Sequence, residues 1–130
     1  MRTTRSGVLA LVLALAAGCG GGEKLYDVSG TVTFDGQPVP AGRVYFDPDP
    51  TAGGSGPQGS AAIKDGKFDT AVEGRGVRGG GGYVIRVAAH DGKVSNENPW
   101  GQPLRGTEYE FKKELPKERS ELMIDVPKPK

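Results

Sequence analysis

Residues 26–36 read Tyr-Asp-Val-Ser-Gly-Thr-Val-Thr-Phe-Asp-Gly. Through the first nine positions, apolar side chains or glycine alternate with polar side chains, and a period of two is typical of a β-strand with one buried face. The Asp35-Gly36 pair that follows is a turn signal, because aspartate tolerates a positive φ and glycine adopts one freely. The stretch therefore predicts a half-buried strand that ends in a tight turn.

Similar alternation returns along the rest of the chain, where no segment longer than a turn has convincing helical periodicity. The further inward rows are Val44 and Phe46; Ala61 and Ile63; Phe68, Thr70 and Val72; Tyr83, Ile85 and Val87; Thr107, Tyr109 and Phe111; and Leu122, Ile124 and Val126. An Asp65-Gly66 pair between the second and third of these rows predicts a β-hairpin. About seven short strands predict an all-β fold, a single small antiparallel β-sandwich.

The turn and loop signals of the sequence place this sandwich domain at residues 26–126. Two prolines in Asp47-Pro48-Asp49-Pro50 end a strand, because they remove hydrogen-bond donors from the ladder. Glycine-rich stretches at 51–59 and 74–82 are expected to be loops, the second of them mobile. Residues 118–121 are read as the lead-in to the last strand, and residues 127–130, Pro-Lys-Pro-Lys, as a disordered tail.

Several of these motifs resemble those of a known domain family. Residues 28–39, followed by 42–46, are similar to the opening of carboxypeptidase regulatory-like domains, and Asp65-Gly66-Lys67-Phe68 and residues 82–87 continue the likeness. Together with the N-terminal segment described next, the chain resembles small lipoproteins of planctomycete-type bacteria. The resemblance implies a transthyretin-like sandwich of seven strands that has no common catalytic site.

The first residues of the chain resemble a bacterial lipoprotein signal. Arg2 and Arg5 form a basic region, residues 8–15 an apolar core, and Ala16-Ala17-Gly18 the small residues before Cys19. The apolar run is too short to span a bilayer, which needs about 20 residues. The resemblance implies that residues 1–18 are cleaved and that Cys19 is lipidated, with residues 19–25 as a glycine-rich tether. An ordinary secretory signal with an incidental cysteine is the alternative.

Composition excludes several classes of function. The chain carries 17 basic and 16 acidic side chains, and loss of Arg2 and Arg5 with the signal makes the mature part slightly acidic, so we expect no nucleic-acid partner. Its single cysteine permits no internal disulfide. An exported fold of this kind would depend on burial and backbone hydrogen bonds alone.

Trp100 is the most informative surface candidate. It lies in a loop with Asn96, Asn98 and Gln102, whose amides, together with a flat exposed ring, would suit a sugar. The alternative, which we favour from sequence, is that the indole folds back and caps one end of the sandwich.

Two motifs are weaker candidates for chemistry. Residues 74–79 match the G-x-G-x-x-G dinucleotide fingerprint but run into a predicted strand rather than a helix, so no nucleotide is expected. Asp47 and Asp49, with Asp91 or Asn96, are candidate calcium ligands, although acidic residues at alternating spacing are missing and we predict no metal. Solvated loop charges are the simpler reading.

A hydrolase is the remaining chemical alternative. His90 and Asp91 would need a nucleophile, and Ser95 and Ser29 are the nearest choices, but neither lies in an elbow or helix-start motif. His90 is better placed on an outward face at a strand end. Residues 104–107, Leu-Arg-Gly-Thr, faintly resemble the terminal tetrapeptide of 5-hydroxyisourate hydrolase, but they are internal and the chain has one histidine, so that activity is rejected. We expect no catalytic residues and no cofactor.

These observations predict an exported module that is lipid-anchored to the cell envelope, with the outer membrane favoured over the inner and the domain facing the periplasm or the exterior. The expected role is non-enzymatic, either binding of an envelope protein or glycan or a passive structural one. A carbohydrate-binding accessory module that uses the Trp100 loop is the alternative, and a hydrolase ranks last.

Overall fold

The computed structural model describes residues 24–129, so the signal, Cys19 and most of the tether lie outside the described residues. The described part is all-β apart from one 3-10 turn, η1 (Pro50–Ala52). Its strands are β1 (Val28–Phe34), β2 (Gln37–Pro38), β3 (Ala41–Pro48), β4 (Gly59–Lys64), β5 (Lys67–Asp69), β6 (Gly74–Arg75), β7 (Gly81–His90), β8 (Tyr109–Leu115) and β9 (Ser120–Val126).

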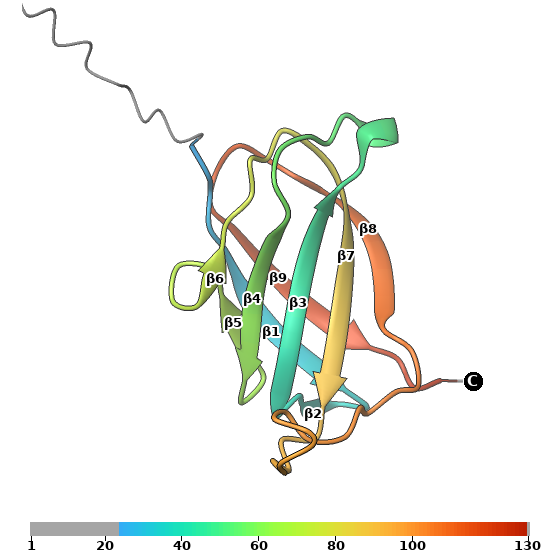
Figure 1. Cartoon of the computed structure of the whole chain (residues 1–130). Helices are drawn as coiled ribbons and strands as arrows, with labels where there is room; N and C mark the ends of the chain where they lie inside the picture. The colour runs from blue at the N-terminus through green and yellow to red at the C-terminus, as the bar shows by residue number, and fades with distance from the viewer. Residues whose placement is uncertain (1–23, 130) are drawn as a thin grey trace, which may run out of the picture.

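All of these strands belong to one hydrogen-bonded sheet, whose main path runs β2-β1-β5-β4-β3-β7-β8, with β6 paired to β4 and β9 paired to β1. The sheet curls so that β1 and β9 lie behind β3 and β7, which gives the two layers of a small sandwich (Figure 1). The predicted all-β sandwich is confirmed. One pair departs from the expected antiparallel order, because β1 and β9 run parallel over their full length.

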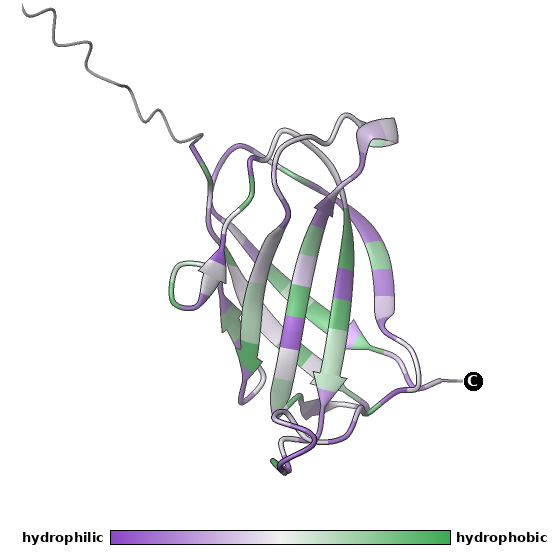
Figure 2. Cartoon of the chain, in the orientation of Figure 1, coloured by the Kyte–Doolittle hydropathy of each residue, from purple (hydrophilic) through white to green (hydrophobic). Residues whose placement is uncertain are grey.

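The core fills the space between the two layers. Green, hydrophobic positions alternate with purple or pale positions along β3, β7 and β9 in Figure 2, as a period of two requires. The buried apolar side chains include Val28, Val32, Val44, Phe46, Ala61, Ile63, Phe68, Tyr83, Ile85, Val87, Leu122, Ile124 and Val126. These residues come from six of the seven predicted rows, so the sequence pattern identified most of the core.

Both predicted Asp-Gly turns are present. Asp35 and Gly36 have φ values of 51° and 75° and join β1 to β2, while Asp65 and Gly66 have φ values of 51° and 77° and join β4 to β5. Positive φ at both central positions is the hairpin turn that matches the twist of paired strands. The second hairpin separates at once, because β5 leaves β4 after one residue pair and continues along β1. This bend carries the sheet from one layer to the other.

Two residues of the predicted inward rows do not face the core. Val72 is 83 % exposed, because the chain turns after Asp69, whose carbonyl accepts the N–H of Val72. Thr107 is exposed and precedes β8 in the long connection from β7. The prediction was wrong at both positions, since alternation in sequence says nothing about where a strand stops.

The glycine-rich stretch at 74–82 is more ordered than a loop. It contains β6 and the start of β7, and Val77, which is buried, exchanges two backbone hydrogen bonds with Tyr26 at 2.7 and 2.9 Å. Glycine is required at Gly74 and Gly76, because a Cβ would lie 2.0 Å from the carbonyl oxygen of Ser60 and 2.4 Å from that of Tyr26. The expectation of a mobile loop is replaced by a close backbone contact.

The segment after β9 is held against the turn that joins β1 to β2. Lys128 lies 2.9 Å from Asp35 as an ion pair.

Within residues 24–129, no helix is long and apolar enough to span a membrane.

Candidate functional site

The connection between β7 and β8, residues 91–108, carries most of the predicted site residues at the lower end of the molecule in Figure 1. Asp91 organises its first part, because one carboxylate oxygen accepts the N–H of Lys93 at 2.8 Å and that of Gln102 at 3.1 Å. Gly92 also donates to the carbonyl of Trp100 at 2.9 Å. Hydrogen bonds among its own residues therefore hold the loop in place.

Trp100 is held against the end of β7. Its ring meets that of His90 edge to face, with centroids 5.4 Å apart and planes at 71°, yet the residue remains 39 % exposed. His90 Nδ1 lies 3.1 Å from the carbonyl oxygen of Gly101. Because a carbonyl only accepts, Nδ1 donates its proton there. Trp100 thus combines a packed edge with an accessible surface, intermediate between the two alternatives of the sequence analysis.

The three predicted amide side chains surround this tryptophan in sequence, and their environments differ. Asn96 and Gln102 are exposed, whereas Asn98 is half-buried and its backbone carbonyl accepts the N–H groups of Ser95 and Gly101. None of the three side-chain amides hydrogen-bonds to another residue of the described range. All three remain available to a ligand.

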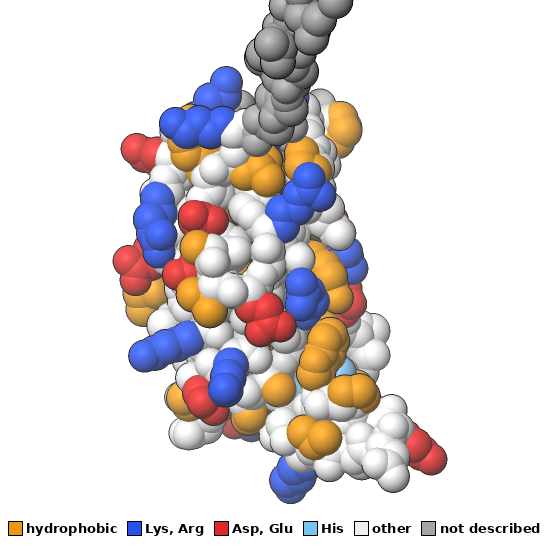
Figure 3. Space-filling model, turned by 60° about the vertical axis from the view of Figure 1, so that its left-hand side comes forward, with side chains coloured by type: hydrophobic (Ala, Val, Ile, Leu, Met, Phe, Trp, Pro, Cys, Tyr) orange, Lys and Arg blue, Asp and Glu red, His pale blue; other side chains and the backbone are white. Residues whose placement is uncertain are grey.

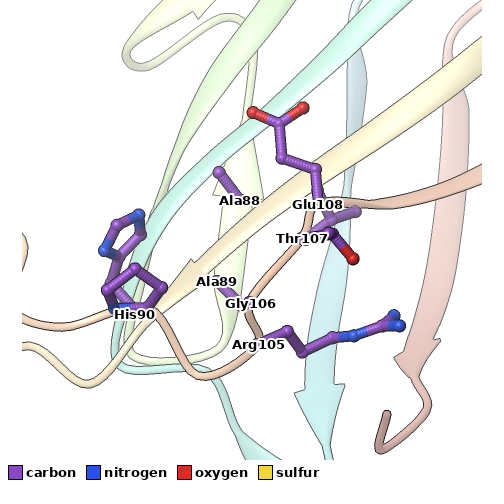
Figure 4. A pocket seen from close by; sticks show the side chains of 9 residues that line it. Ala88, Ala89, His90, Arg105, Gly106, Thr107 and Glu108 are labelled. Carbon is purple, nitrogen blue, oxygen red and sulfur yellow. The ribbon is translucent and has the colours of Figure 1, made fainter. Parts of the chain in front are cut away.

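A cavity of about 200 Å³ lies beside His90, between β7 and the segment that leads into β8. Figure 4 shows His90 and Glu108 on one side of it and the Arg105 side chain extending away on the other. The cavity arises because the two facing segments differ in length. His90 pairs with Pro103, and Val87 pairs with Tyr109. Between these pairs, β7 has two residues, 88–89, and the facing segment has five, 104–108. The extra residues bow outward and leave the space.

Arg105 lines this cavity, and the surroundings of its guanidinium group are unusual. Its guanidinium carbon lies 5.6 Å from the centre of the Tyr109 ring, and its Nε and Nη1 are buried without a hydrogen-bond partner among the described residues. Buried guanidinium N–H groups are normally paired. The rejected Leu104-Arg105-Gly106-Thr107 motif therefore does lie at a cavity, which its sequence position did not reveal.

Arg86 forms a charged network on the outward face of the same sheet. It donates from Nε to Asp47 at 2.7 Å and from Nη1 to Glu108 at 2.8 Å, and its guanidinium lies 4.7 Å from the Tyr45 ring centre. Partial burial would raise the pKa of Asp47, but the hydrogen bonds from Arg86 and Gln58 lower this pKa below its ordinary value. The only sign of this network in the sequence is a charged side chain in the middle of a strand, and the network was not predicted.

The hydrolase residues are not assembled into a catalytic group. His90 ends β7 on its outward face, as expected, but Asp91 caps backbone amides rather than His90, and Ser95 Oγ accepts the N–H of Asn98 at 3.1 Å. Ser29 lies in β1, in the other layer. No hydrogen bond within the described residues joins a serine to His90.

The calcium hypothesis also meets a geometric obstacle. Asp47 pairs with Arg86, and Asp49 caps η1 by accepting the N–H of Thr51 at 3.0 Å. Both lie at the upper end of the sheet in Figure 1, whereas Asp91 follows β7 at the lower end. Within the part of the chain that the structure covers, no three His, Cys, Asp or Glu side chains come close enough to hold a metal ion.

A second and larger depression, of about 620 Å³, lies where β4 and β5 separate. Its rim includes Lys64, Lys67, Asp69, Glu73 and Glu121. The side of the molecule that carries β5 and β6 intermingles basic, acidic and hydrophobic side chains (Figure 3). This mixture selects no class of ligand by charge.

The chain was also compared with known proteins. It matches no protein-family model, no curated protein and no solved structure.

Proposed function

We propose that this protein is a lipid-anchored, non-enzymatic module of the cell envelope that presents the loop of residues 91–108 for binding. The observation that carries the proposal is the placement of that loop. The described chain begins at the upper end of the molecule in Figure 1, and the Trp100 loop lies at the lower end. A domain tethered through its N-terminus would direct this loop away from the membrane.

The length of β7 sets the scale of this arrangement. Its ten residues run from Gly81 to His90, and at about 3.3 Å per residue they separate the two ends by about 30 Å. A tether of a few glycine-rich residues spans only about 10–15 Å. The domain would remain close to the bilayer while its loop reaches a neighbouring envelope component, either protein or glycan.

The proposed lipidation of Cys19 would hold the protein at the envelope, and it has a direct test. Cys19→Ser is expected to move the protein from the membrane fraction to the soluble fraction or leave it unprocessed, because the thiol is the proposed acceptor of the acyl chains. Detergent phase partitioning measures this. A processed mutant that still enters the detergent phase would overturn the anchor, and Ser6→Ala, which leaves the thiol intact, is the matched control.

Binding of a carbohydrate is the alternative that Trp100 favours. Trp100, which is 39 % exposed as a residue, offers a ring surface, and the free amides of Asn96, Asn98 and Gln102 offer hydrogen bonds. We expect Trp100→Ala to abolish retention on immobilised envelope glycans while lowering the free energy of unfolding by only about 1–2 kcal/mol.

The measurement pairs glycan retention with chemical denaturation, and Val72→Ala, at an exposed position outside the loop, is the control. A loss of 3 kcal/mol or more, the order expected for removal of a buried aromatic ring, without any glycan retention in the parent protein would identify Trp100 as a cap. The passive structural role would then be favoured.

The family resemblance remains part of the proposal. An all-β sandwich with Asp-Gly turns at residues 35–36 and 65–66 supports a carboxypeptidase regulatory-like, transthyretin-like domain. Such a domain would act by presenting loops, which agrees with a non-enzymatic role.

A further inference from the structure

Besides the two-residue strands β2 and β6, the two long strands β8 and β9 each pair with one neighbour, and their free edges differ in chemistry. β8 pairs only with β7, and β9 pairs only with β1 among the described strands. An outer strand exposes backbone N–H and C=O groups that another strand can pair with, and proteins usually block such edges with charges or prolines. Only one of these two edges carries a charge at an inward position.

The edge of β8 is protected by a lysine at an inward position. Lys113 lies opposite Tyr83, whose side chain is buried, so Lys113 occupies the face that points toward the other layer. Glu110, Lys112 and Glu114 supply further charges. A strand added there would have to accommodate the Lys113 ammonium group against its apolar face.

The edge of β9 has no charged side chain at an inward position. Leu122, Ile124 and Val126 point inward and are buried, and β9 contains no proline or lysine. Ser120 donates its N–H to Asp27 at 3.1 Å, toward β1. Because successive residues direct their N–H groups to opposite edges, the amides of Glu121, Met123 and Asp125 face away from β1.

The outward side chains of the same three residues define what can pair there. Met123 is 85 % exposed and lies between two carboxylates, Glu121 and Asp125. In an antiparallel pair of two copies of β9 with full overlap, each Glu121 would lie opposite the other copy's Asp125. Like charges directly opposite each other destabilise a strand pair. The outward side chains of Glu121, Met123 and Asp125 therefore disfavour self-association of β9 and favour a basic partner.

We infer that the free edge of β9 is a docking site for an extended peptide segment that carries basic side chains on either side of an apolar one. Backbone hydrogen bonds from Glu121, Met123 and Asp125 supply the pairing, as in other cases of strand addition. The basic side chains lie opposite Glu121 and Asp125, and the apolar one lies opposite Met123. The site is independent of the Trp100 loop.

The test uses the full-length chain in detergent and a labelled probe peptide, Thr-Lys-Val-Leu-Val-Lys-Thr. Fluorescence anisotropy measures the affinity. We expect the lysine peptide to bind about tenfold more tightly than the same peptide with both lysines replaced by glutamate. Hydrogen exchange at the Glu121, Met123 and Asp125 amides should slow when the lysine peptide binds. Tight binding should weaken as salt increases.

N-methylated probes separate strand addition from simple charge attraction. In antiparallel pairing the Leu and the second Lys direct their amides at β9, whereas the two Val amides point away. Methylation of the first pair should abolish binding, and methylation of the valines should leave it within about twofold. Glu121→Lys should shift preference toward the glutamate peptide; Asp125 is left unchanged because it accepts a hydrogen bond from Thr33.

Three results would overturn the inference. The glutamate peptide could bind as tightly as the lysine peptide, the two N-methylated probes could bind equally, or the three edge amides could already be protected without peptide in a protein that sediments as a dimer. The last result would assign the edge to a second copy of this chain. None of them bears on the Trp100 proposal.

Discussion

Gly42→Ala is expected to prevent the native fold or to destabilise it by at least about 3 kcal/mol, a large share of the 5–15 kcal/mol that holds a domain together. Gly42 is a buried residue of β3, paired with Ile63 of β4 and Ala89 of β7. Its φ is 142°, a region that residues with a side chain rarely adopt. A Cβ there would lie 1.9 Å from the carbonyl oxygen of Ala88.

That oxygen belongs to the central strand β7, so it cannot move aside without breaking the ladder. Gly106→Ala is the matched control, because Gly106 has nothing within 4 Å of its would-be Cβ and no positive φ. Circular dichroism and urea denaturation of both variants measure the difference. Equal stability of the two would mean that β3 and β7 do not pack as described.

This glycine also shows where sequence reasoning stops. The Asp-Gly turns were predictable because the two residues that form each turn are adjacent in the chain, and their φ values of 51° and 75–77° follow from local chemistry. The need for glycine at Gly42 arises from the Ala88 carbonyl, which is distant in sequence. Alternation predicts which face a strand buries but not which backbone it approaches.

The same limit applies to strand partners. β1 and β9 lie near opposite ends of the chain, and their parallel pairing brings Val32 beside Ile124. Both residues were correctly expected in the core, because inward rows are visible in sequence. Leu115 was not, since it follows three charged residues, 112–114, that are typical of an exposed segment; it is nevertheless buried, opposite Gly81 of β7.

The candidate site was predictable only in part. The Trp100 loop was recognisable from its amides and proline, and His90 from its position at the end of an alternating row. The contact between the two rings, with centroids 5.4 Å apart, depends on the way Asp91 folds the loop back. The cavity beside Arg105 depends on five residues opposing two, and an insertion of that kind becomes visible only once the register is known.

Ile85→Ala should lower the free energy of unfolding by about 2–4 kcal/mol, because it removes three carbon atoms from a closely packed site. Ile85 is fully buried in β7, between Phe46 of β3 and Phe111 of β8. Phe46 is itself fully buried, so the wall on that side has little freedom to collapse into the space. The loss should therefore approach the upper part of the range, and thermal unfolding should shift by about 4–8 °C per kcal/mol.

Met123→Ala provides the control for the same chemistry on the surface. Met123 is 85 % exposed in β9, so truncation there should change the free energy of unfolding by no more than about 0.5 kcal/mol. Urea denaturation followed by circular dichroism gives both values, provided that each transition is two-state. A loss below about 0.5 kcal/mol for Ile85→Ala would place the inward row of β7 outside the core. A large loss for Met123→Ala would instead mean that the outward face of β9 is covered in the folded protein.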